Sequence, residues 1–375
     1  MTENSIILTE SIAVKKFYFE KPEHPNHYCE IKEMAGKITE IPPNHYVIKM
    51  DAISLCHMES KYHKAMVPPE KMNRYPIIPG HEGSGTIYKS NGTLQPGTRV
   101  SIISFQHCST CTNCQEERTN YCLEGKLVGS RAPGLLQTHL VYPESFVVPI
   151  AETVSSYLAA LAEPSTAAYR AIQSTKPTGK VAVYGSSSLG YLLVANLSYF
   201  GNISKEQLCY LGRSPSKLEL AQEIAQTIHL NQENIEKYAN SFDYVFEAVG
   251  APESIQNSLD LTKIGGRLTI LGTKDNPVTL YVGSEKKEIP NVTNFVNNGH
   301  SLEIGGKYVG SSSVSLPEDY IQVTTAMTNR DYEKLIQKMI SPERLFRIKK
   351  ADDVKSAFEY REENPHVKKV FLTFN

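Results

Sequence analysis

The stretch CSTCTNCQEERTNYC, residues 108–122, places four cysteines within fifteen residues. They are Cys108, Cys111, Cys114 and Cys122, at the spacing C-x2-C-x2-C-x7-C. A short excursion of chain can bring these sulfurs to one point without a sheet or helix, which predicts a closed tetrahedral thiolate site for zinc. Two disulfides or four unrelated thiols are the alternatives, and a reducing compartment would disfavour disulfides. Four thiolates leave no open position, so this zinc is expected to be structural.

Length and composition limit the possible functions. A chain of 375 residues exceeds one ordinary core and suggests two domains, and 40% hydrophobic with 21% charged residues are globular values. The formal net charge of -1 provides no basic field for nucleic acid. The N-terminus lacks a basic start followed by a long apolar run, and no window offers about eighteen consecutive apolar residues. We therefore expect a cytoplasmic protein with no membrane or nucleic-acid partner.

The two halves of the chain have different patterns of expected secondary structure. Up to about residue 150, short β-rich runs alternate with turns such as Pro79-Gly80 and Pro96-Gly97. The strands expected there span residues 47–53, 98–103, 138–142 and 146–148. From about residue 153, helical and strand patterns alternate, which predicts a parallel sheet covered on both faces.

The alternating half is expected to open with a helix at residues 154–172. The strands expected after it are 180–184, 207–211, a short one near Ile228, 243–248 and 267–271, and the helices are 189–200, 215–226 and 252–262. After Gly272 the pattern loosens. The tail then carries two expected helices, 331–339 and 352–361, and a closing strand, 367–373.

A glycine-rich turn, GSSSLG at residues 185–190, joins the first strand of this half to its helix. Such a turn lets backbone N–H groups and the helix N-terminus face a pyrophosphate. Ser187 replaces the middle glycine of G-x-G-x-x-G, and its hydroxyl could donate a hydrogen bond instead. A plain turn is the alternative, and the α/β alternation that follows favours dinucleotide binding. The residues expected to contact the cofactor here are Gly185, Ser187, Leu189 and Gly190.

Three further residues could hold a second metal. Cys56 ends VIKMDAISLC, His81 lies in PGHEGSG, and Glu163 opens EPSTAAYRA. Thiol, imidazole and carboxylate groups all bind zinc, and three protein ligands leave a fourth position for water or substrate. Each residue also has a structural reading, as a buried thiol, a turn histidine or a glutamate on a helix surface. Spacing cannot combine them, because they lie far apart in the sequence.

The order of the motifs resembles that of a known family. The sequence CxxE, GHExxG, four-cysteine lobe, EP loop, glycine turn, FEAVG and GGRLTILG is similar to the zinc-containing alcohol and polyol dehydrogenases of the medium-chain dehydrogenase/reductase family, over nearly the whole chain. The resemblance implies an α/β fold in which a Rossmann doubly wound parallel sheet is inserted in a β-rich GroES-like catalytic domain. It implies a catalytic domain with the zinc lobe at 1–157, a Rossmann nucleotide-binding domain at 158–307, and a return to the catalytic domain at 308–375.

By this resemblance, Cys56, His81 and Glu163 bind a catalytic zinc, which gives two zinc ions per chain. Glu59 takes the place of the usual aspartate three residues after the first ligand, and Glu82 that of the acid that usually follows the histidine ligand. The implied reaction moves a hydride between a nicotinamide cofactor and the carbon of a secondary alcohol or ketone, while zinc stabilises charge on its oxygen.

One departure concerns the proton. Many family members carry Ser or Thr two residues after the first cysteine as the start of a proton relay, and here that residue is Met58. A thioether cannot pass a proton. The proton must travel by water, by a substrate hydroxyl, or by a neighbour such as His57, Lys61 or His63, each of which also has a structural reading.

The second strand of the Rossmann half, LCYLGRSPSKL at residues 208–218, indicates the cofactor. An acidic residue at the end of this strand would bind the adenosine ribose and repel a 2'-phosphate. Gly212 stands there, followed by Arg213 and Ser214, so we predict NADP(H). The alternative is that Arg213 points to solvent and Gly212 only makes the turn.

Within the family, AISLCHMESKYH at residues 52–63, the missing relay hydroxyl and the GRS sequence are most similar to the ribulose-5-phosphate reductases, or ribitol-5-phosphate dehydrogenases. The complete four-cysteine lobe departs from that group. A polyol or sugar is the expected substrate, with ribulose 5-phosphate as the narrower hypothesis. A catalytically inactive zinc-binding scaffold of the same fold is the alternative, favoured by Ser187 and Met58. The family suggests a homodimer or homotetramer.

Overall fold

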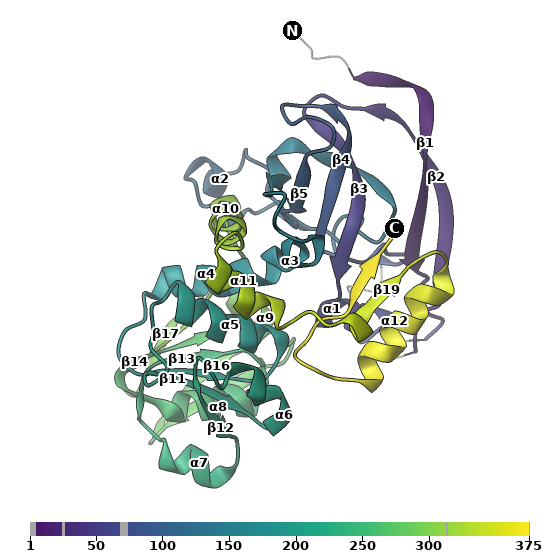
Figure 1. The fold of residues 1–375 in the computed structure, drawn as a ribbon. Coiled ribbons are helices and arrows are strands. Elements are labelled where there is room, and N and C mark those ends of the chain that lie inside the picture. The colour runs from purple at the N-terminus through teal and green to yellow at the C-terminus, as the bar shows by residue number, and fades with distance from the viewer. Residues whose placement is uncertain (1–4, 25–26, 68–73, 313, 375) are drawn as a thin grey trace. The chain divides into compact units, whose positions relative to one another are not determined.

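The computed structural model describes residues 5–24, 27–67, 74–312 and 314–374, and its chain forms two compact units (Figure 1). The first unit contains residues 1–117, 122–163 and 320–375, and the second contains residues 118–121 and 164–319. The C-terminal segment thus returns to the first unit. The second unit ends beyond residue 307, the end predicted for the Rossmann domain, because β18 (Lys307–Ser311) lies in its sheet.

The first unit is built on a sheet with the strand order β19-β20-β3-β4-β5-β9, in which β8 also pairs with β3. The strands are β3 (His45–Ser54), β4 (Glu82–Asn91), β5 (Arg99–Ile102), β8 (His139–Pro143), β9 (Val147–Pro149), β19 (Leu345–Arg347) and β20 (Phe371–Thr373). The apolar run of β3 is buried along most of its length because strands flank it on both sides. The last strand, β20, pairs antiparallel with β3, so segments from the two ends of the chain meet in one sheet.

Two further pairs of strands and several helices complete this unit. The sequence did not reveal the antiparallel ribbon of β1 (Ile6–Phe19) and β2 (Ile31–Ile41). Few residues of the ribbon are buried, so its two-residue hydrophobic alternation is weak. The remaining elements are α1 (His57–His63), β6 (Phe105–Gln106), α2 (Thr112–Gln115), β7 (Lys126–Leu127), η3 (Glu144–Phe146), α3 (Ser156–Ala160), α11 (Arg330–Gln337), η5 (Pro342–Arg344) and α12 (Ala351–Glu363).

The second unit contains a sheet with the strand order β12-β11-β10-β13-β14-β18-β17. The first six strands are parallel, in the Rossmann order 3-2-1-4-5-6, and β17 is antiparallel at the edge. The strands are β10 (Val181–Tyr184), β11 (Leu208–Gly212), β12 (Gln226–His229), β13 (Phe242–Glu247), β14 (Thr262–Ile270) and β17 (Leu302–Ile304), with β18 as given above. The predicted fold class is confirmed.

Helices and turns connect these strands. They are α5 (Ser188–Tyr199), α6 (Pro215–Leu218), η4 (Glu219–Ala221), α7 (Gln232–Lys237), α8 (Pro252–Leu261) and α9 (Val292–Asn297). The helix α4 (Ala162–Thr175) precedes β10, α10 (Pro317–Ala326) follows β18 and belongs mainly to the first unit, and η2 (Thr119–Tyr121) lies in the four-cysteine segment at residues 108–122. The loosened pattern after Gly272 includes the hairpin of β15 (Val278–Val282) and β16 (Glu285–Ile289).

Two helix predictions were wrong in extent. The helix expected at residues 154–172 is split into α3 and α4, where Pro164 fits the first turn of a new helix but would break a continuous one. The helix expected at 215–226 ends as α6 at Leu218, followed by one 3₁₀ turn, because Gln226 already belongs to β12 beside β11. Strand pairing therefore includes Gln226, which local propensity assigned to a helix, and residues 222–225 form the turn that leads to it.

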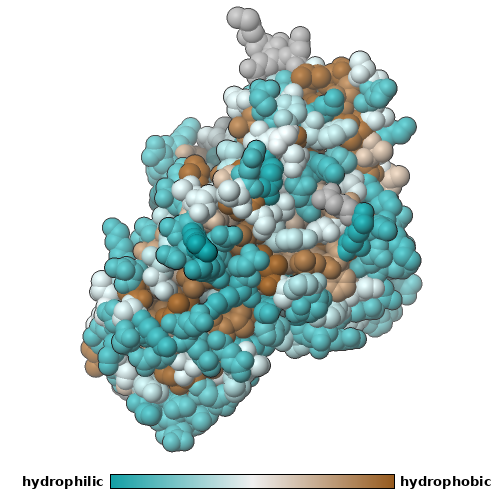
Figure 2. Space-filling model, viewed as in Figure 1, coloured by the Kyte–Doolittle hydropathy of each residue, from teal (hydrophilic) through white to brown (hydrophobic). Residues whose placement is uncertain are grey.

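Burial follows the sheets. The central strands of the second unit bury residues such as Val183, Leu211, Val245 and Leu268 completely. Hydrophilic residues predominate on the face seen in Figure 2, with hydrophobic ones scattered among them. Within the described ranges, no helix combines the length and apolar character needed to span a membrane.

Candidate metal sites and nucleotide loop

The ends of two paired strands bring Cys56 and His81 together. Cys56 is the N-cap of α1, two residues after β3 ends, and His81 directly precedes β4. Ser54 and Glu82 are partners in the antiparallel register of β3 and β4, so the two ligand-bearing segments leave the sheet side by side. Gly80, with φ +98°, makes the turn before His81, a conformation that side chains rarely adopt.

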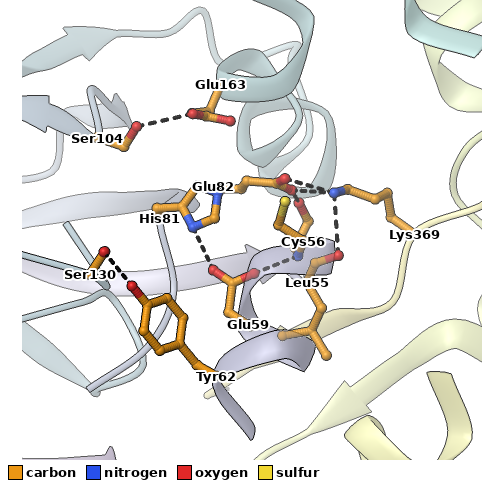
Figure 3. A network of polar contacts seen from close by, with 11 residues as sticks. Leu55, Cys56, Glu59, Tyr62, His81, Glu82, Ser104, Ser130, Glu163 and Lys369 are labelled. Carbon is orange, nitrogen blue, oxygen red and sulfur yellow. Dashed lines mark hydrogen bonds and ion pairs between the residues drawn. The ribbon is translucent and has the colours of Figure 1, made fainter. Parts of the chain in front are cut away.

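The donor atoms of Cys56, His81 and Glu82 all lie within 4.8 Å of one another (Figure 3). A thiol, an imidazole and a carboxylate are the three side-chain types that bind zinc, and three of them leave a position open. The chemistry of this donor set therefore fits a zinc ion with one exchangeable position.

Glu59 orients the histidine. One carboxylate oxygen of Glu59 lies 2.5 Å from Nδ1 of His81, and the other accepts a hydrogen bond of 2.8 Å from the backbone N–H of Cys56. This contact directs the Nδ1 hydrogen to Glu59 and leaves Nε2 for a metal. Burial alone would lower the pKa of His81, but the charge of Glu59 and the hydrogen bonds to Cys56 and Glu59 outweigh it and raise that pKa well above its usual value.

The carboxylate of Glu82 also binds a lysine that no sequence pattern indicated. Nζ of Lys369 lies 2.7 Å and 2.6 Å from the two carboxylate oxygens, and the Ser54 hydroxyl donates to one of them. Lys369 also donates to the carbonyl oxygen of Leu55 at 3.3 Å. Burial opposes its charge, yet Glu82 and Cys56 raise the pKa of Lys369. Lys369 therefore balances the negative charge of the donor set from the C-terminal segment.

Glu163, the third predicted ligand, is not part of the three-residue donor group. It lies in the first turn of α4, and its Oε1 accepts a hydrogen bond of 3.1 Å from the hydroxyl of Ser104 (Figure 3). Burial raises the pKa of Glu163 to about 7. The charge of His81 lowers this pKa and the charge of Glu82 raises it, so the three groups interact electrostatically. The ligand role of Glu163 stays a prediction.

The four cysteines of the lobe converge as their spacing predicts. The sulfur of Cys111 lies 3.5 Å from that of Cys114 and 3.9 Å from that of Cys122, and Cys108 lies 4.0 Å from Cys114. A tetrahedron with zinc–sulfur bonds of ~2.3 Å has edges of ~3.8 Å. A disulfide needs ~2.05 Å, and all the cysteines are free thiols. Backbone N–H groups of Cys108 and Cys111 also point at sulfurs of the set, as thiolates require.

The residues that were considered for a proton relay differ in their exposure to solvent. Met58 is half-buried in α1, and His57 is exposed. His63 is buried against the rings of Phe19 and Phe358. The structural reading of His63 is therefore favoured.

Met58→Ser is expected to leave turnover unchanged or raise it modestly, because no side-chain hydroxyl relays the proton at this position. If the methionine mainly fills space, the substitution creates a cavity and lowers the melting temperature instead. Steady-state kinetics measured together with thermal unfolding would separate the two. A large fall in kcat at unchanged melting temperature and KM would contradict this expectation.

The glycine turn of the second unit has the close packing that a nucleotide loop requires. Gly185 has φ +115°, and a side chain at Gly190 would collide with the carbonyl oxygen of Gly185. Ser187 is the N-cap of α5, and its hydroxyl oxygen accepts a hydrogen bond of 3.1 Å from the N–H of Gly190. The hydroxyl hydrogen of Ser187 remains able to donate to a ligand. The serine can therefore replace the glycine without preventing the loop from binding a ligand.

The loop after β11 has two notable features. Gly212 is buried against Ser186, and a side chain at position 212 would collide with that serine. Arg213 is exposed, and its carbonyl oxygen lies 3.1 Å from Nε2 of His229. Among the described residues, none forms a hydrogen bond or ion pair with the Arg213 guanidinium, so the backbone is held while the side chain can meet a ligand.

A Rossmann sheet combined with a β-rich unit that carries a Cys–His–carboxylate set and a four-cysteine lobe defines a zinc-dependent oxidoreductase. The profile of the alcohol dehydrogenase GroES-like domain matches residues 42–152, and that of the zinc-binding dehydrogenase domain matches residues 207–329. The chain belongs to the zinc-type alcohol and polyol dehydrogenases of the medium-chain dehydrogenase/reductase family.

Individual relatives agree with this family. The chain is 27% identical to an L-threonine 3-dehydrogenase of Rhizobium johnstonii, over 63% of this chain and 71% of the relative. It is 26% identical to the sorbitol dehydrogenase of Bacillus subtilis, over 68% of this chain and 75% of the relative. Its fold matches the crystal structure of galactitol-1-phosphate dehydrogenase from Escherichia coli with a TM-score of 0.74 and 19% identity, over 96% of this chain and 99% of that one.

Proposed function

We infer that this protein transfers a hydride between NADP(H) and a secondary alcohol or ketone of a polyol or sugar. The narrower proposal is the interconversion of ribulose 5-phosphate and ribitol 5-phosphate. The observation that carries the reaction class is the Cys56, His81 and Glu82 set, with its oriented histidine, in a chain that also folds a Rossmann unit. Relatives named for sorbitol and galactitol 1-phosphate support a polyol-type substrate.

Bound zinc would polarise an alcohol or carbonyl oxygen, and the nicotinamide would accept or supply the hydride. The residues of this chain prepare that step. Cys56 and His81 would hold the metal, Glu59 fixes the His81 tautomer, and Lys369 balances the charge of Glu82. Glu163 accepts a hydrogen bond from Ser104 and has a pKa raised to about 7. Its carboxylate could ligate the metal or accept a hydrogen bond from a substrate hydroxyl.

The preference for NADP(H) rests on the loop after β11. Gly212 offers no carboxylate to repel a 2'-phosphate, and packing against Ser186 leaves no room for one. The exposed guanidinium of Arg213 can pair with the phosphate. A hydrogen bond to a charged group contributes about 1.5–3 kcal/mol, which corresponds to about a ten- to hundredfold preference.

Arg213→Gln is expected to raise the KM for NADPH by about ten- to hundredfold while changing the KM for NADH little. Gly212→Asp together with Arg213→Ile should move the enzyme further towards NAD(H). The packing of Gly212 means that Ser186→Gly must accompany the aspartate, or the loop will be strained. Equal efficiency of wild type with both cofactors, or an unchanged ratio of kcat/KM values in Arg213→Gln, would show that the loop does not select the cofactor.

A substrate panel tests the reaction class. Zinc-loaded protein is mixed with NADPH and ketoses, or with NADP and polyols, while nicotinamide absorbance is followed. Turnover of ribulose 5-phosphate would support the narrow proposal, and turnover of other ketoses only would restrict it to the broader one. Absence of turnover with every pair would favour the inactive scaffold.

We extend the proposal to two zinc ions per chain, a cytoplasmic location and a homodimer or homotetramer, which metal analysis, cell fractionation and light scattering can test.

A further inference from the structure

A cationic side chain that the reaction chemistry does not use lies next to the Cys56 and His81 segments. The Nη1 atom of Arg74 donates hydrogen bonds to the hydroxyls of Tyr62, at 3.0 Å, and Ser130, at 2.8 Å. These two hydroxyls are 2.6 Å apart. The three side chains come from α1, from the segment leading to β4, and from the turn after β7, so they form one cluster from distant parts of the sequence.

This cluster is adjacent to the candidate metal site through two of its members. Tyr62 follows Glu59 by three residues on α1, which puts both on one face of the helix. Ser130 follows Gly129, where a side chain would meet the carbonyl oxygen of Gly80, the residue before His81, at 2.8 Å. Figure 3 shows the Tyr62 hydroxyl directed to Ser130, with Glu59 and His81 nearby. The cluster thus flanks Cys56 and His81, the residues that would hold the metal.

The bonding of Arg74 leaves capacity for an anion. Both hydrogen bonds use the single nitrogen Nη1. Within the described part of the chain, no carboxylate pairs with Arg74, although the side chain is half-buried. A partly desolvated guanidinium with a planar fork of donors, beside two hydroxyls, is suited to a phosphate group. A purely structural role would need only the two hydroxyl contacts.

We propose that Arg74, with Ser130, binds the phosphate of a phosphorylated sugar or polyol substrate. This inference rests on the proposed dehydrogenase function and adds the substrate class that the site selects. Arg74 acts on the end of the substrate remote from the reacting carbon, so it determines specificity. Tyr62, only 2% exposed, accepts a hydrogen bond from the guanidinium and so positions it.

The test compares Arg74→Gln with wild type on ribulose 5-phosphate and on ribulose. Arg74→Gln is expected to raise the KM for ribulose 5-phosphate by about ten- to hundredfold, with a much smaller effect on kcat and on ribulose. Arg99→Gln serves as the control, because the Arg99 guanidinium donates hydrogen bonds to the Glu152 carbonyl oxygen and to the Ser156 hydroxyl and takes no part in the Arg74 cluster. An equal loss of kcat/KM for both ketoses would assign Arg74 a structural role and overturn the proposal.

Two further measurements keep the result interpretable. If Arg74→Gln does not fold, Arg74→Lys, which keeps the charge but loses the fork, should still lower the preference for the phosphorylated ketose, and an unchanged preference would refute the site. Calorimetry of zinc-loaded protein with ribitol 5-phosphate, ribitol and ribonate needs no turnover. Tighter, Arg74-dependent binding of ribitol 5-phosphate supports the site even if no dehydrogenase activity is found. Equal binding of ribitol and ribitol 5-phosphate, or tighter binding of the carboxylate ribonate, overturns it.

Discussion

Cys111→Ser is expected to remove one zinc ion per chain and to unfold the lobe at residues 108–122. The four sulfurs are the centre of this segment, which contains only the short helices α2 and η2. Structural zinc contributes about 10–16 kcal/mol of apparent binding free energy in zinc-finger peptides, comparable with the whole stability of a domain. We therefore expect a large fall in the melting temperature or insoluble protein, measured by thermal unfolding and metal analysis.

Leu123→Ala is the matched control, because Leu123 directly follows the last lobe cysteine and is 70% exposed. It should keep both the zinc content and the melting temperature of wild type. Chelation of the lobe zinc in wild type should reproduce the effect of Cys111→Ser. A Cys111→Ser protein with full zinc content and an unchanged melting temperature would refute the structural role of this set.

The lobe could be predicted because its information is local. Its ligands fall within fifteen residues, and the structure places the sulfur of Cys114 3.5 Å from that of Cys111 and 4.0 Å from that of Cys108. The Rossmann order followed equally from a repeated local pattern, since alternating strands and helices leave few ways to build a parallel sheet. Local patterns failed where pairing decided the outcome, as at residues 222–226, which lead into and begin β12 instead of continuing a helix.

The candidate catalytic site was only partly predictable for the opposite reason. Cys56 and His81 were selected by resemblance, and Glu82 was expected only as a supporting acid, yet its carboxylate lies in the donor group. Lys369 is 287 positions from Glu82, and no spacing rule connects two residues so far apart. The Arg74 and Ser130 pair is likewise created by the fold. A buried charge requires a partner, so Glu82 implied some cation, but the sequence could not indicate which one.

Cys56→Ala is expected to remove the second zinc ion and to lower turnover by at least about a thousandfold, since several kcal/mol of charge stabilisation would be lost. The fold should survive. Cys56 caps α1 through its backbone N–H, which donates to Glu59 whatever the side chain, and the lobe cysteines are separate. Metal analysis should find one zinc ion per chain, and kcat should be measured at saturating cofactor.

The predicted role of Glu163 is tested against that of Glu82 in the same assay. Glu163→Ala should leave a folded protein with impaired turnover. If Glu163 is a ligand, zinc affinity falls, whereas if it only contacts substrate, the zinc content stays at two.

Glu82→Gln should be less stable than wild type, because it leaves the buried charge of Lys369 without its partner, a change that costs about 3–5 kcal/mol in buried pairs. Wild-type turnover in Cys56→Ala, or a single zinc ion in correctly folded wild type, would show that no catalytic zinc is bound at this donor set.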